Sequence, residues 1–296
     1  MLLNKFELTG KFKNQLLKAS STLPDIKLNN GFLDRATFEF YKQTIINFES
    51  HDLIKLFKAL LSNNKNSKGY IVVDCNKLFN DLEFNQKINV LTAICSMVSR
   101  PVQVFDRWDL WKELGVTFDV APYRARGTGH NPLHIDVANA TYPPNYSVLF
   151  CYRPDPFGDG CSIVSNLQKA VDQLDKAEIE VLAKSKFYEG SFYNLTGVGK
   201  AINPFPVIEK KEQKLWQVRF SAKMIPNMKD CIEKEIMIKL EKIVIDNQEK
   251  FFLDKNQILI MNQKIICHGR ESLDDKKQRR LRLDERRLIF QSFLIE

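Results

Sequence analysis

The sequence lacks the features of a membrane-spanning or exported protein. None of its apolar runs approaches the roughly 18 residues that a membrane helix needs. The opening stretch MLLNKFELTG is interrupted by Lys5 and Glu7 before an apolar signal segment could form. We therefore expect a cytoplasmic protein with no membrane partner.

Paired cysteine motifs are also missing. The six cysteines stand at positions 75, 95, 151, 161, 231 and 267, and no two of them form a Cys-x-x-Cys pair. This spacing argues against a zinc knuckle and against a dithiol redox motif. Scattered cysteines in a reducing compartment are expected to be mostly buried thiols.

Excess charge is concentrated in one place. The 44 Lys and Arg residues exceed the 36 Asp and Glu residues, which gives a net charge of +8. The densest basic run is KKQRRLRLDERR at 276–287. A single run of this kind is typical of a solvated loop or a small-anion site, so nucleic acid is not the expected partner. Nucleic-acid demethylation is a less favoured alternative, and it predicts salt-dependent binding of oligonucleotides.

The chain begins with helical patterns and continues with short strands. Apolar residues at three-to-four spacing predict helices at 33–50, 51–63 and 85–99, with a buried strand at 70–75 between them. From residue 116 onward, short β-branched and aromatic runs alternate with turn residues, which favours a β-sandwich or barrel. The predicted strands are 116–123, 133–136, 146–153, 161–165, 187–195, 215–222, 257–263, 264–269 and 286–295.

Two helical inserts are expected within the β region, near 166–185 and 228–252. The first has Asp175 as N-cap and Glu178 three residues later, which is the capping-box pattern. The second has an apolar stripe that would pack on a sheet, formed by Ile232, Ile236, Leu240 and Ile243. No internal repeat or linker is visible, so we expect one domain over 1–296, with helical cladding at 1–65 and a β-rich core at 66–296.

The segment NPLHIDVANATYPPNY holds a histidine and an acid two residues apart, His134 and Asp136. Residues at this spacing on a strand share one face. A third candidate, His268, ends an apolar strand in MNQKIICHGRESL. Two histidines and one carboxylate can occupy one face of an octahedral Fe(II) and leave three positions open. The alternative is a core histidine that is hydrogen-bonded to a nearby acid.

An oxygenase that uses a dicarboxylic keto acid also needs a cationic group for the far carboxylate, and arginine supplies a rigid fork. Arginines stand at 279, 280, 282, 286 and 287, just after His268. Arg286 and Arg287 begin the last predicted strand, so one of them must face the interior and the other must face out.

Together these segments resemble the iron- and 2-oxoglutarate-dependent dioxygenases of the taurine dioxygenase and clavaminate synthase-like family. The motifs occur in the family order over roughly residues 65–296. They are LHID followed by YPPNYSVLFCYRPDP, then FGDGCSIVS, HGRES and ERRLIF.

The resemblance implies an α+β fold with a double-stranded β-helix core, which is a cupin-like jelly roll, and flanking helices. It implies Fe(II) bound by His134, Asp136 and His268. It further implies 2-oxoglutarate held by Arg286 and Ser162, with Arg282 as second choice because the pair 282 and 286 keeps the family's four-residue spacing.

The activity implied is hydroxylation of a small polar metabolite, such as a free or carrier-bound amino acid, with 2-oxoglutarate and O2 converted to succinate and CO2. Desaturation or ring closure, and a non-enzymatic metal-binding barrel, are the alternatives. The sequence leaves the substrate and the oligomeric state open. Candidate substrate-binding residues flank the iron motifs, and these are Arg124, Arg126, His130, Asn139 and Arg270.

Overall fold

A nine-stranded sheet forms the centre of the computed structural model, which describes residues 5–8, 10–48, 51–80, 82–189, 194–210 and 215–296. Its strand order is β1-β4-β13-β8-β15-β5-β3-β2, and β6 pairs with β15 beside this path. All pairs are antiparallel except β1 with β4. The strands are β1 (Lys5–Glu7), β2 (Leu28–Asn29), β3 (Phe32–Leu33), β4 (Tyr70–Asp74), β5 (Arg100–Val102), β6 (Lys112–Gly115), β8 (Tyr146–Arg153), β13 (Gln257–Asn262) and β15 (Leu288–Ile295).

A smaller antiparallel sheet of four strands has the order β12-β9-β14-β7. Its strands are β7 (Asn131–His134), β9 (Ser162–Asn166), β12 (Glu249–Phe251) and β14 (Ile266–Arg270). A separate hairpin pairs β10 (Ile208–Lys210) with β11 (Trp216–Val218).

The two main sheets face each other across an apolar layer. Val164 and Ile266 of the small sheet belong to the same buried cluster as Leu259 and Ile289 of the large sheet. Because successive strand residues point to opposite faces, this layer identifies the inner face of each strand. Functional side chains on that face meet between the sheets.

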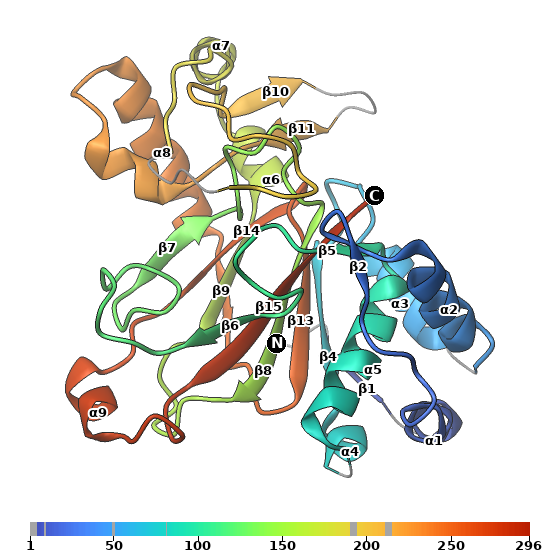
Figure 1. The fold of residues 1–296 in the computed structure, drawn as a ribbon. Coiled ribbons are helices and arrows are strands. Elements are labelled where there is room, and N and C mark those ends of the chain that lie inside the picture. The colour runs from blue at the N-terminus through green and yellow to red at the C-terminus, as the bar shows by residue number, and fades with distance from the viewer. Residues whose placement is uncertain (1–4, 9, 49–50, 81, 190–193, 211–214) are drawn as a thin grey trace.

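Helices cover the outer faces (Figure 1). Those before residue 100 bury their apolar stripes on the large sheet, and they are α1 (Gly10–Ala19), α2 (Arg35–Ile46), α3 (His51–Leu60), α4 (Asn76–Phe79) and α5 (Phe84–Ser96). A second group packs beside the small sheet, and its members are α6 (Leu167–Val171), α7 (Lys176–Leu182), α8 (Ile232–Asp246) and the 3-10 helix η2 (Ala222–Asn227). The short α9 (Asp275–Arg280) precedes β15. Among the described residues, no helix is long and apolar enough to cross a membrane.

Most of the predicted elements are confirmed. Helices α2, α3 and α5 lie within their predicted ranges or one residue outside them, β8 spans 146–153 as predicted, and Asp175 and Glu178 form the capping box of α7. The mixed α/β class with antiparallel sheets is also as expected. Five of the six cysteines are buried or half-buried, and Cys231 is exposed.

Three predictions about elements were wrong or only partly right. The run 116–123 is irregular, because β6 ends at Gly115 and a turn follows in which the Thr117 hydroxyl bonds Asp119. The run 187–195 contains four residues outside the described part, and its described ends make only isolated bridges. On α8, Ile232 is 55% exposed, and the buried stripe is Ile236, Met237, Leu240 and Val244.

Candidate metal centre and active site

The structure brings together the three residues predicted to bind metal. His134 ends β7 and is the direct cross-strand partner of His268 on β14, while Asp136 follows two residues after β7. Nε2 of His134 lies 3.7 Å from Oδ1 of Asp136, and Nε2 of His268 lies 3.3 Å from Oδ2. One ligand atom from each residue lies within 4.8 Å of the others. All three are therefore positioned to hold one ion.

The hydrogen bonds of His134 leave the nitrogen that faces this cluster available to a cation. Its Nδ1 lies 2.7 Å from the carbonyl oxygen of Pro132 and donates to it, so the lone pair is on Nε2. The ammonium of Lys223 lies 3.1 Å from that Nε2 and donates to it. A positive group thus already occupies a position where a metal would bind, which fits a cation site.

Asp136 is fixed by its neighbours as an ionised carboxylate. Its Oδ2 accepts hydrogen bonds from Ser147 Oγ at 2.7 Å and from Gln291 Nε2 at 3.0 Å, and its backbone N–H donates to Gln263 Oε1 at 2.5 Å. Burial alone would raise the pKa of Asp136, but the two imidazoles and Ser147 hold it well below its usual range. Oδ1 remains available as a metal ligand.

His268 is also in the protonation state that a metal ligand needs. Burial lowers the pKa of its imidazole to about 4, despite the nearby charge of Asp136. The ring is therefore neutral at pH 7, and proton release need not precede metal binding.

A cavity of about 500 Å³ opens on the metal cluster. His134, Asp136 and Gln291 form part of its wall. Most of its other charged residues are basic, and they are Lys112, Arg124, Arg126 and Lys223. Glu189 is the other acid, and Asn139 and Tyr123 are uncharged polar groups. Phe105, Trp108 and Phe293 supply apolar surface. This volume is within the usual range of small-molecule sites, about 300–1,000 Å³.

Glu189 and Lys223 are charged groups held in a poorly solvated part of this cavity. Burial raises the pKa of Glu189, and its Oε2 is buried without a hydrogen-bond partner, although the backbone N–H of Asn139 donates to the carboxylate. Burial lowers the pKa of Lys223 to about 8, while the nearby Asp136 and Glu189 oppose this shift. Sequence reasoning missed both residues.

The arginines near the C-terminal end differ sharply in their surroundings. Arg282 is 74% exposed at its side chain and pairs with Asp284 at 2.8 Å. Arg286 donates to the carbonyl of Leu281 at 3.2 Å, and its guanidinium stacks on the ring of Phe118. Neither is directed between the sheets.

Arg287 is the arginine on the inner side. It is 8% exposed, and it is four residues before Gln291, whose side chain reaches Asp136, so both occupy the inward-facing alternation of this strand. No described residue forms a hydrogen bond or ion pair with its guanidinium, and burial lowers the pKa of Arg287 while the nearby charge of Asp155 opposes this shift. The prediction that one of the pair 286 and 287 faces the interior is thus right, but the inner residue is Arg287.

Ser162 and Arg270 lie side by side on the inner face of the small sheet. They are cross-strand partners on β9 and β14, and Ser162 is buried. Arg270 donates from Nη2 to the carbonyls of Gly127 and Gly129, at 2.7 and 2.8 Å. Burial and the neighbouring charge of Arg287 lower the pKa of Arg270 to about 9. Arg270 therefore braces the loop before β7, and it does not line the cavity.

Of the other predicted substrate residues, Arg124, Arg126 and Asn139 line the cavity. His130 instead borders a separate hollow with Lys250 and Glu271. This hollow also contains Leu133 and Ile163, which face the helices beside the small sheet and not the layer between the sheets. A substrate contact by His130 is not supported by this position.

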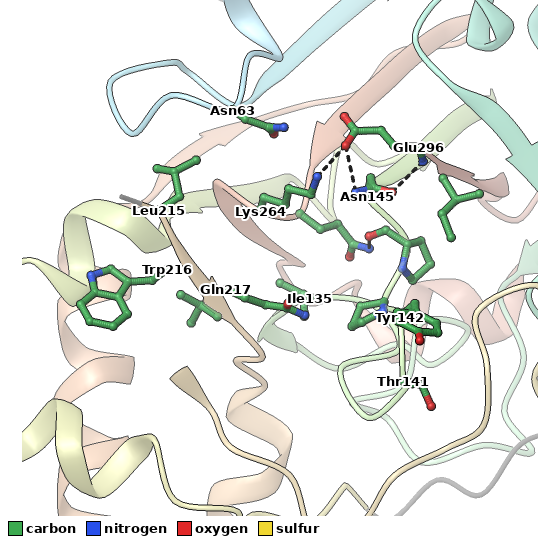
Figure 2. Close-up of a pocket in the computed structure, with 15 residues that line it drawn as sticks. Asn63, Ile135, Thr141, Tyr142, Asn145, Leu215, Trp216, Gln217, Lys264 and Glu296 are labelled. Carbon is green, nitrogen blue, oxygen red and sulfur yellow. Dashed lines mark hydrogen bonds and ion pairs between the residues drawn. The ribbon is translucent and has the colours of Figure 1, made fainter. Parts of the chain in front are cut away.

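A second cavity, of about 440 Å³, lies beyond Ile135 (Figure 2). Lys264 and Asn145 point toward Glu296 on its rim and bond it at 2.7 and 3.5 Å. Trp216 and Gln217 form the opposite wall. None of the three clustered metal-ligand residues lines this cavity, so we place the chemistry in the first one.

Solved structures with a similar fold include iron oxygenases. An asparagine oxygenase in complex with Fe(II), 2S,3S-3-hydroxyasparagine and succinate matches with a TM-score of 0.74 and 13% identity, over 99% of this chain and 93% of that chain. The non-haem iron oxygenase OrfP, with Fe and α-ketoglutaric acid, matches with a TM-score of 0.69 and 13% identity, over 99% and 94%. At this identity the likeness shows a shared fold.

Comparison with curated protein sequences finds no match. Residues 112–283 match the family described as Taurine catabolism dioxygenase TauD, TfdA family. The matched segment covers more than half of the 296 residues and contains His134, Asp136 and His268. The chain therefore belongs to the TauD/TfdA dioxygenase family, as its sequence motifs predicted.

Proposed function

We propose that the protein is an Fe(II)- and 2-oxoglutarate-dependent oxygenase that hydroxylates a C–H bond of an amino acid. The main support is the cluster of two imidazoles and one carboxylate at the end of a cavity. Its ligand set is the one that non-haem Fe(II) oxygenases use, with three positions left for other ligands.

The two facing antiparallel sheets support a jelly-roll core, with the small sheet carrying the metal ligands. One apolar cluster joins the N-terminal helices to the large sheet, for example Tyr41 and Leu91 with Phe150 and Ile260. We therefore propose that residues 1–296 act as one dioxygenase domain.

Iron would be held by Nε2 of His134, Nε2 of His268 and Oδ1 of Asp136. When bound there, iron would supply the oxidative chemistry of this class, in which 2-oxoglutarate and O2 are converted to succinate and CO2 and one oxygen atom is transferred to the substrate. The chain contributes by orienting His134 through the carbonyl of Pro132 and by keeping the His268 imidazole neutral. It also fixes Asp136 through Ser147 and Gln291. A carboxylate at 136 fills the position that a halogenase leaves for chloride, which favours hydroxylation.

For the distal carboxylate of 2-oxoglutarate we propose Arg287, in place of the predicted Arg286 and Arg282. Arg287 is a buried guanidinium that lacks a partner in the described part of the chain, and such a group is stabilised by a bidentate carboxylate. Its charge acts on Arg270, whose cross-strand partner is Ser162. Ser162 therefore stays in the proposed site.

An amino acid suits the cavity because carboxylate-binding arginines and an ammonium-binding glutamate line it together. The structural neighbours point the same way, since one is an asparagine oxygenase and OrfP has been solved with L-Arg. Desaturation or ring closure of an amino-acid derivative remains the second candidate, since the same iron site serves those reactions.

The test is succinate formation from 2-oxoglutarate with Fe(II) and each of the twenty amino acids. We expect at least one amino acid to stimulate succinate release and to gain one oxygen atom by mass spectrometry. His134→Ala should abolish this release, whereas the control His130→Ala, outside the cavity, should keep it. Succinate release that does not need iron would refute the proposal. No succinate release with any amino acid or derivative would also refute it and would favour a metal-binding barrel.

A further inference from the structure

We propose that the substrate of this site is an acidic amino acid, with Lys223 binding its side-chain carboxylate and Glu189 binding its ammonium group. This inference rests on the proposed function and adds a substrate class to it. It follows from the charges that line the cavity and from the position of Lys223.

The cavity has more positive charge than its own acids and cofactors can neutralise. Four cationic side chains line it, against the two carboxylates of Asp136 and Glu189. The two charges of Fe(II) and the two of 2-oxoglutarate cancel, so the four cations still exceed Asp136 and Glu189 by two charges. A net positive field therefore faces the substrate, which favours an anion and opposes a cationic amino acid.

Lys223 must change its contact when metal binds. In the structure its ammonium donates to Nε2 of His134 at 3.1 Å. A metal takes that lone pair and repels the ammonium, so the side chain must turn away from the cluster. The backbone of η2 stays anchored, since Ser221 bridges to His134, and the flexible lysine stem then presents the charge to the cavity.

Glu189 provides the complementary group for the substrate ammonium. Its Oε2 is buried and has no hydrogen-bond partner, so a donor from the ligand would satisfy it. Glu189 and Lys223 attract each other electrostatically, but within the described part of the chain no ion pair joins them. Glu189 can therefore bind a substrate group, and so can Lys223 once it has left His134.

The two arginines of the cavity suit the α-carboxylate, which all amino acids share. Arg124 and Arg126 lie on the loop before β7 and line the cavity, where they suit an α-carboxylate. Lys112 is fixed over the rings of Phe105 and Trp108, at 4.5 and 4.6 Å. Discrimination between acidic and neutral side chains thus depends on Lys223.

The experiment uses two pairs of near-isosteric ligands, aspartate with asparagine and glutamate with glutamine. Calorimetry on the protein loaded with Fe(II) and 2-oxoglutarate, under argon, gives binding, and succinate release in air gives turnover. We expect at least one acid to bind about tenfold or more tightly than its amide, because a charge-assisted hydrogen bond is lost in the amide. Lys223→Met should reduce this ratio to within about twofold, while Lys250→Met, which lies outside the cavity, should leave it unchanged.

Glu189→Gln should weaken both members of a pair by a similar factor, because both carry the ammonium group. Equal or tighter binding of the amides by the native protein overturns the substrate class, and this comparison needs no variant. If neutral or basic amino acids then stimulate succinate release by the protein, the oxygenase function stands and only this inference fails. If no amino acid binds and none releases succinate, both fail.

Discussion

Replacing Arg287 with glutamine is the sharpest test of how the co-substrate is held. The guanidinium can form two parallel bonds with a carboxylate, and each hydrogen bond to a charged group contributes about 1.5–3 kcal/mol. Glutamine keeps at most one uncharged bond, so a loss of about 3 kcal/mol is expected. This corresponds to a rise in the Kd for 2-oxoglutarate on the order of 100-fold.

The same variant should not destabilise the protein without its ligands. Arg287 is only 8% exposed and its guanidinium has no hydrogen-bonding partner among the described residues, so its charge costs folding free energy. The Tm of metal-free Arg287→Gln should therefore equal or exceed that of the native chain. A residue with a purely structural role would lower Tm when replaced.

Arg286→Gln is the matched control, since Arg286 is adjacent in sequence but contacts Leu281 and Phe118. Calorimetric titration of 2-oxoglutarate into the Zn²⁺-loaded protein, which cannot turn over, measures both. The Kd of the control should stay within about twofold of the native value. A large loss in Arg286→Gln with none in Arg287→Gln would refute the assignment.

Three further predictions follow from the hydrogen bonds of the structure. Gln291→Leu removes one donor to Asp136, and metal affinity measured by titration should fall about 10–100-fold; unchanged affinity would show that this bond does not orient the ligand. Burial would raise the pKa of Asp74, but Lys5, the Asn76 N–H and Gln257 hold this pKa below its ordinary value. Ionised Asp74 therefore stabilises the fold above about pH 4, and this contribution is lost as the pH falls further. Urea unfolding should therefore show Asp74→Asn to be less stable than the native chain at pH 7, with a gap that narrows in acid; a constant gap would contradict this. Asp175→Ala removes the capping box of α7 and should cost about 1 kcal/mol in the same assay, whereas Asp172→Ala, at an exposed helix end, should cost less.

The sequence was sufficient for elements whose signal is local. The run at 146–153 has β-branched and aromatic residues throughout, and β8 occupies those residues. The capping box at Asp175 and Glu178 similarly depends only on residues three apart. The metal cluster could be predicted because both histidines lie in short strand-like runs, His134 at the end of β7 and His268 within β14.

The sequence could not predict the roles of residues that depend on which way a strand faces or on packing between distant segments. Alternation showed that Arg286 and Arg287 face opposite ways, but the pairing of Ile289 with Cys151 decides which one faces the inner layer. No sequence pattern predicted a role for Lys223, because it lies 89 residues after His134 in the chain. The bridge between Ser221 and His134 brings the two residues together in the fold. The basic lining of the cavity likewise combines β6 and the loop after it, which carry Lys112, Arg124 and Arg126, with Lys223 of η2 about a hundred residues later.

Anomalous diffraction at the iron absorption edge would test the central claim most directly. Crystals grown under argon with Fe(II) and 2-oxoglutarate should show one peak, about 2.0–2.2 Å from Nε2 of His134, Nε2 of His268 and a carboxylate oxygen of Asp136. The keto acid should take two further positions, with its distal carboxylate on Arg287. A peak bound elsewhere, or no peak between these three side chains at saturating iron, would contradict the account.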